Sequence, residues 1–191
     1  MVSLSELWLP ILLSAVFVFV VSSLVHMVLK WHNSDWRTLP NEADVMAAMR
    51  AAGLTRGQYF FPNCKDMKDM SSPEMQEKYN AGPVGFMTVL ANGMPGMGKS
   101  LIQWFLFTIV IGVFCGYIGT FSLLPGAGYG DVFQVIGTAA ILGYAVSCIT
   151  DSIWKGVSWT ATAKFVVDGV LYALTTAGTF AWLWPELPDL I

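Results

Sequence analysis

The chain alternates between long apolar segments and polar connections. Four segments are almost entirely apolar, each with about 20 or more residues, and they cover positions 7–29, 100–124, 132–154 and 161–184. At a rise of about 1.5 Å per residue, a helix of this length crosses a hydrocarbon layer of ~30 Å. Barrel strands alternate over only about 10 residues, so these continuous runs predict helices. The pattern therefore predicts an all-α fold, an integral membrane four-helix bundle.

The connection at 30–99 is long and has a pattern of its own. Asn41 is placed to cap a short amphipathic helix, which carries acidic residues in its first turn and is followed by Gly53. Such a helix suits the surface of a membrane or of the bundle. We therefore expect a single membrane domain over 1–191, with a partly helical loop subdomain at 30–99.

A second short helix is expected later in this connection. Ser72 followed by Pro73 is typical of a helix start, and this helix is expected to end before Gly82. Residues 85–90 are expected to be extended.

Composition supports a membrane protein. The 191 residues are 55% hydrophobic and 12% charged, about half the charged share of a soluble domain, and the formal net charge is -3. A soluble protein this apolar would expose patches that aggregate. Without a basic excess, nucleic acid is not an expected partner, whereas membrane lipids are.

The basic residues orient the predicted bundle. All of them lie in the first and third connections between the apolar segments or, for the last one, at the adjoining start of the fourth segment: Lys30, Arg37, Arg50, Arg56, Lys65, Lys68, Lys78, Lys99, Lys155 and Lys164. Because positive loops remain in the cytoplasm, both termini are expected outside. Tryptophans near the segment ends agree with two interfacial belts.

A layer of polar residues is expected on the cytoplasmic side of the bundle. Part of it is a stripe at i, i+4 spacing along the fourth segment, and intramembrane ionisable groups are functional candidates. Local pairing of Asp168 with Lys164 and of Asp151 with Lys155 is the structural alternative. The layer, which is also a possible solute path, comprises His26, Gln103, Asp151, Lys164, Asp168 and Tyr172.

Small residues predict close helix contacts. Gly112 and Gly116 form a GxxxG pair, and Gly169, Ala173 and Ala177 form a small-xxx-small run beside the polar stripe. Such faces let two helices approach closely, within one protomer or between protomers.

No cofactor or metal is predicted, and the candidate soft-metal ligands are Cys64, Met67 and Met70. A thiol and thioethers suit Cu(I), whereas methionines packed on a membrane or partner are the alternative. The two histidines, His26 and His32, are poorly placed to join them, and haem ligation by the pair is not indicated.

Several stretches resemble an uncharacterised group of small bacterial membrane proteins with four spans. They are Gln76–Phe86, Met97–Ser100 leading into Gln103–Phe105, Asp151–Trp154 and Thr176–Pro185. The resemblance implies the bacterial inner membrane and brings no activity or site residue.

No catalytic set of side chains is recognisable, so a non-enzymatic role is expected. The leading interpretation is a homo-oligomeric or accessory subunit, a scaffold, of a larger membrane complex. A small oligomeric channel or transporter for an ion or small solute, using the polar stripe, is the first alternative. A membrane enzyme acting on lipid or quinone is the second.

Overall fold

The computed structural model describes residues 1–187 and is mostly helical. The chain divides into two compact units. The helical unit contains the residues before Arg37 and most of those after Pro95, and the loop unit contains Arg37–Pro95 with Trp154–Gly156.

Four helices of the chain are long and apolar enough to cross a membrane, as the hydropathy pattern predicts. The first consists of a 3-10 turn η1 (Leu4–Leu7), α1 (Trp8–Leu24) and a π-helical turn η2 (Val25–Leu29). The second is α4 (Met97–Ser122), and the fourth is α7 (Trp159–Trp182). The third is composite: α5 (Tyr129–Tyr144), a 3-10 turn η5 (Val146–Cys148) and α6 (Ile149–Lys155).

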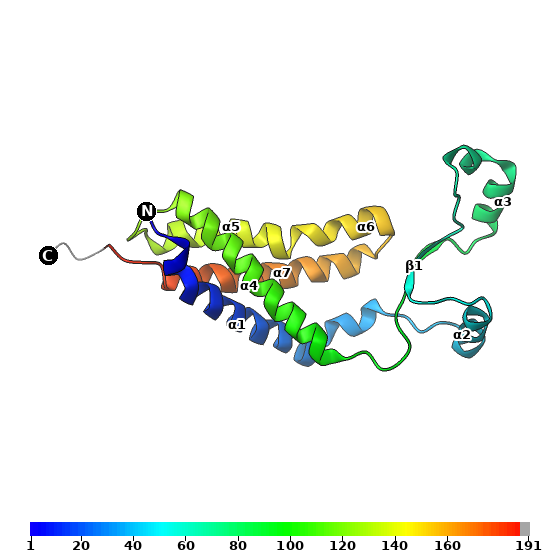
Figure 1. The fold of residues 1–191 in the computed structure, drawn as a ribbon, viewed down its shortest axis with the longest axis horizontal. Helices are drawn as coiled ribbons and strands as arrows, with labels where there is room; N and C mark the ends of the chain where they lie inside the picture. The colour runs from blue at the N-terminus through cyan, green and yellow to red at the C-terminus, as the bar shows by residue number, and fades with distance from the viewer. Residues whose placement is uncertain (188–191) are drawn as a thin grey trace. The chain divides into compact units, whose positions relative to one another are not determined.

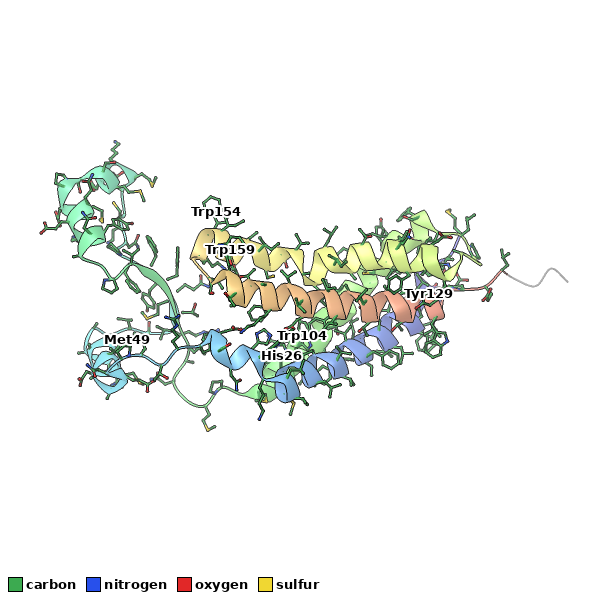
Figure 2. All side chains as sticks on the ribbon, turned by 180° about the vertical axis from the view of Figure 1, so that it is seen from behind. His26, Met49, Trp104, Tyr129, Trp154 and Trp159 are labelled. Carbon is green, nitrogen blue, oxygen red and sulfur yellow. The ribbon has the colours of Figure 1, made fainter. Side chains whose placement is uncertain are left out.

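The long helices of the helical unit pack side by side (Figure 1). Helix α7 contacts α1 and α5, and α4 contacts the same two helices. Trp159 and Tyr129 lie at opposite ends of this unit (Figure 2). Most of the side chains in its core are small or branched, and few are large. The core includes Leu7, Ile11, Val18, Cys115, Val132, Ile136, Ala140, Ala173 and Phe180.

The third apolar segment breaks at Ala145, where the α-helix ends with φ at -108° and a 3-10 turn follows. The break lies against Gly169 of α7. A Cβ on Gly169 would lie 2.6 Å from the carbonyl oxygen of Tyr144 and 2.7 Å from the Cα of Ala145. Only glycine permits this approach of two backbones.

All five predicted small packing residues are buried within the chain. Gly112 faces Ile11 of α1, and Gly116 faces Leu4, Leu7 and Ile11. Ala173 is part of the core, and Ala177 faces Gly137 of α5. These faces therefore join helices of one chain.

The loop unit begins with α2 (Glu42–Ala51). Asn41 occupies the N-cap position, as expected, but its side chain makes no capping hydrogen bond and its φ is 49°. A later 3-10 turn, η4, spans Met67–Ser71. Helix α3 (Pro73–Ala81) starts and ends where the sequence predicts. Its start is stabilised by the Ser72 hydroxyl, which accepts a hydrogen bond from the Met75 amide at 3.2 Å.

The loop unit also contains a two-stranded antiparallel sheet. The expected extended segment is β2 (Gly85–Val89), and its partner β1 (Gly57–Phe61) was not predicted. In the pairing register Phe60 lies opposite Phe86, and their ring centroids are 4.6 Å apart.

Candidate functional site

The candidate site begins where α1 ends. The π-helical turn η2 is followed by Lys30, whose φ of 52° is in the left-handed region that non-glycine residues seldom adopt. This residue stops the helix, and the next five residues form the 3-10 helix η3 (Trp31–Asp35), which contacts α7. The reversal brings polar side chains of η3 to the fourth long helix.

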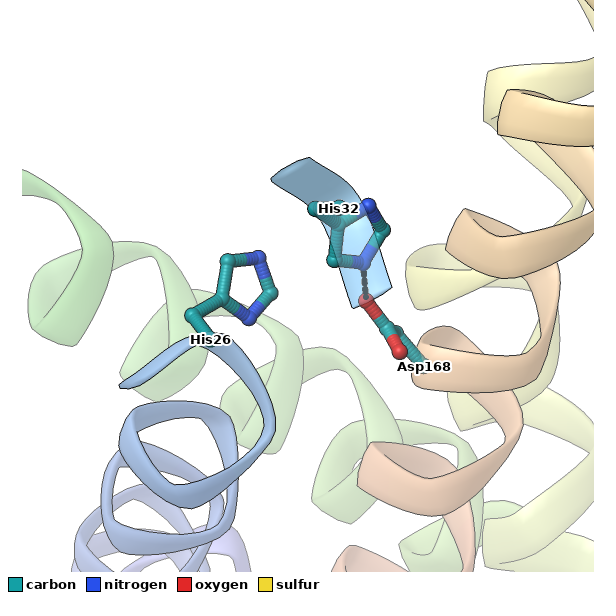
Figure 3. A group of neighbouring side chains, drawn as sticks. All are labelled: His26, His32 and Asp168. Atoms are coloured by element: carbon teal, nitrogen blue, oxygen red, sulfur yellow. Dashed lines mark hydrogen bonds and ion pairs between the residues drawn. The ribbon is translucent and has the colours of Figure 1, made fainter. Parts of the chain in front are cut away.

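His32 is the centre of the site. Its Nε2 lies 2.8 Å from Oδ2 of Asp168 on α7 (Figure 3). Its Nδ1 lies 2.7 Å from Oδ2 of Asp35. Phe165 stacks on the imidazole at 4.7 Å between ring centroids, and His26 stacks at 4.9 Å. The ring plane and both ring nitrogens are thereby fixed.

Lys164 completes the link between η3 and α7. Its ammonium donates hydrogen bonds to Oδ1 of Asp35 at 2.6 Å, to the Ser34 hydroxyl at 2.7 Å and to the Trp31 carbonyl at 2.8 Å. The hydrogen bond from Lys164, with a smaller contribution from His32, lowers the pKa of Asp35 below its ordinary value. Asp35 is therefore ionised at neutral pH.

The two histidine bonds fix a proton count. An ionised carboxylate only accepts hydrogen bonds, so both bonds form only when both imidazole nitrogens carry protons or when one carboxyl is protonated. In either case His32, Asp35 and Asp168 together hold one proton more than a neutral imidazole with two carboxylates. With the Lys164 ammonium included, the net charge of the four groups is zero.

Some polar atoms of the site are buried without a hydrogen-bond partner among residues 1–187. They are Oδ1 of Asp168, the Tyr172 hydroxyl and Nε1 of Trp31. Asp168 is only 2% exposed. A buried polar atom left unpaired costs free energy, and such atoms often mark places that bind water or an ion.

The predicted polar layer is only partly assembled. His26, Lys164 and Asp168 meet at the site, joined by His32 and Asp35. Gln103 is exposed on α4, and Asp151 lies half-buried on α6. The Tyr172 ring packs with Trp104 and Tyr144, at 5.6 and 5.8 Å between centroids.

The predicted local pairing of Asp168 with Lys164 is wrong. Oδ2 of Asp168 is bonded to His32, and Oδ1 has no partner in the described part of the chain. Lys164 bonds to η3 instead. The reason is geometric: the ammonium reaches three acceptors in η3, whereas its own helix would offer it only one carboxylate.

His32 and Asp35 were missed as site residues. Both lie outside the apolar segment, in a stretch that reads as an ordinary polar connection. Their i, i+3 spacing was the available signal, because it places an imidazole and a carboxylate on one face of a helical turn. Their meeting with α7 depends on the left-handed turn at Lys30.

The predicted soft-metal residues lie in the loop unit. The Cys64 thiol is 2.7 Å from the Asp66 carbonyl and donates to it, and Met67 and Met70 of η4 are exposed. Within residues 1–187, the histidine, cysteine and acidic side chains that are grouped closely enough to hold a metal ion are His26, His32 and Asp168.

Comparison of the chain with protein-family models, with curated proteins and with solved structures gave no match.

Proposed function

We propose that the protein is a non-enzymatic, multi-pass subunit of a bacterial inner-membrane complex, formed with copies of itself or with other proteins. In this proposal the four long helices form a bundle in the bilayer, both termini lie outside, and the loop unit is cytoplasmic. The observation that carries it is the absence of a core in the loop unit.

None of the residues of the loop unit, all of which the structure describes, is buried. Many of its large apolar side chains are exposed: Leu39, Met46, Met67, Met70, Val84, Phe86, Leu90 and Met94. A unit of this size with a two-stranded sheet has little stability of its own. Exposed apolar side chains in such a unit favour burial against a partner surface.

The orientation follows from charge. Lys30, Lys99, Lys155 and Lys164 all lie near the ends of long helices on the side of the two basic connections. Positive residues close to the ends of membrane spans remain in the cytoplasm.

The ion network also favours a static, scaffold-type role. His32, Asp35 and Lys164 are bonded to one another or to Asp168 in a closed set with balanced charge. Groups paired in this way join η3 to α7 and stiffen this part of the helical unit.

The first test is the mass of the purified full-length chain in mild detergent, measured by light scattering and native electrophoresis. We expect a complex larger than one protomer. Phe86→Ser should reduce its size or release a co-purifying protein, because it removes an exposed ring of β2. Thr88→Ser, two residues along the same face, is the matched control and should leave the complex intact. Monomers alone, with no co-purifying protein, would refute the proposal.

A small channel or transporter is the second candidate, and one observation favours it. Asp168 and Tyr172 lie one turn apart on α7, and each has a buried polar atom with no partner among the described residues. Such atoms could bind a passing ion or solute. Proteoliposome flux that persists in Asp168→Asn and in Tyr172→Ala would eliminate this candidate.

A further inference from the structure

We propose that His26, His32 and Asp168 form a binding site for a divalent transition-metal ion of the zinc type. Their ligand atoms all lie within 4.8 Å of one another (Figure 3). The chain has two histidines, and both are in this group. The site includes the His32–Asp168 pair of the ion network described above, and its test does not depend on whether the chain assembles into a complex.

The spacing of the two bonded ligands suits a metal. Nε2 of His32 and Oδ2 of Asp168 are 2.8 Å apart with a proton between them. Two ligands at the usual zinc distances of about 2.0–2.2 Å on a tetrahedral ion are roughly 3.4 Å apart. If Nε2 of His32 and Oδ2 of Asp168 move apart by about half an ångström, a zinc ion therefore fits in the place of the proton between them.

The surroundings of His32 resemble the outer shell of known metal sites. A histidine that binds a metal through one nitrogen usually donates the other N–H to a carboxylate, which sets the tautomer and the ring orientation. Nδ1 of His32 donates to Asp35 at 2.7 Å, and Lys164 holds that carboxylate at 2.6 Å. Nε2 is thereby the nitrogen that faces Asp168.

Asp168 provides independent support. Its carboxylate is 2% exposed, and Oδ1 has no hydrogen-bond partner within residues 1–187. A metal bound to this carboxylate would interact with the unpaired oxygen directly or through a bound water.

His26 supplies the third ligand after a change of rotamer. Its ring now stacks on His32, with 25° between the ring planes, so its nitrogens do not converge with Nε2 of His32 on one point. The side chain is exposed. It can therefore rotate to direct a nitrogen toward Nε2 of His32 and the Asp168 carboxylate.

The ligand types select the metal. Two imidazoles and one carboxylate suit Zn²⁺ and its neighbours, whereas Mg²⁺ and Ca²⁺ prefer sites built from oxygen ligands alone. Three protein ligands on zinc leave a fourth position for water or another ligand.

The test uses the full-length protein with a tag free of histidine, purified in detergent and stripped with a chelator. Zn²⁺ is then titrated against a chromophoric competitor. We expect one ion per chain, with affinity reduced at least about tenfold in His26→Gln and in Asp168→Asn. Asp35→Asn should weaken binding by about 10–100-fold, the usual effect of losing the carboxylate behind a ligating histidine.

Two controls keep the result interpretable. His26→Gln alters an exposed side chain, so loss of binding there does not reflect unfolding, and its unfolding temperature without metal should equal that of the wild type. Cys64→Ser should bind Zn²⁺ like the wild type, and Co²⁺ bound to the wild type should lack sulfur-to-metal absorption bands. No binding by the wild type, binding unchanged in His26→Gln and Asp168→Asn, or loss of binding in Cys64→Ser would each overturn the proposal.

Discussion

The contact between Gly169 and the break in the third long helix makes a quantitative prediction. In Gly169→Ala the new methyl carbon would lie 2.6 Å from the Tyr144 oxygen and 2.7 Å from the Ala145 Cα. Both are backbone atoms, so no rotamer change relieves the overlap. The two segments must separate by roughly 0.8 Å to restore ordinary contact. Overpacking of this kind costs about 1–3 kcal/mol.

The assay is thermal unfolding in detergent, followed by intrinsic tryptophan fluorescence. On the scale of soluble domains of similar length, 1 kcal/mol shifts the unfolding temperature by about 2–4 °C, so Gly169→Ala should lower it by roughly 2–12 °C. Gly178→Ala is the matched control on the same helix, because its Cβ would meet only the Tyr129 hydroxyl at 3.5 Å. If Gly169→Ala unfolds at the temperature of Gly178→Ala, the close backbone contact does not exist.

Three further predictions concern polar contacts. Lys164→Met should lower the unfolding temperature more than Lys99→Met does, because it leaves Asp35 without its closest cation, whereas Lys99 is exposed. Ser72→Ala should weaken the start of α3 by about 1 kcal/mol and speed amide exchange there, whereas Ser71→Ala should not. The hydrogen bond from Lys78 lowers the pKa of Glu74 below its ordinary value of 4.5, so carboxyl NMR of Lys78→Met should show this pKa raised. The small stabilisation from this exposed pair is complete above the pKa that Glu74 has in the unfolded chain. It is lost as the pH falls through the lowered pKa of the folded state.

The sequence predicted the parts of the fold that depend on local pattern. Long apolar runs are enough to place four helices, and the Ser72–Pro73 pair is enough to start α3. The break at Ala145 was not predicted, because no proline marks it and glycine and serine, such as the nearby Gly143 and Ser147, also occur within the unbroken long helices. It depends on a contact with Gly169, which comes from a different helix.

The candidate site was predictable only in its α7 part. Lys164 and Asp168 were recognised because one turn of helix separates them within an apolar segment. Their partners in η3 are more than 125 positions away along the chain. That pairing follows from the turn at Lys30 and from the packing of α1 on α7, and neither is a property of a short stretch of sequence.

The distance along the chain between η3 and α7 has a consequence for biosynthesis. Trp31–Asp35 leaves the ribosome long before Lys164 and Asp168 have been translated. Until then His32 and Asp35 can bond only to each other or to water. The adjacent α5 and α7 can pair as a hairpin as soon as both exist, whereas the first helix acquires its polar link to the last one near the end of translation. A chain truncated before Lys164 would therefore lack this junction.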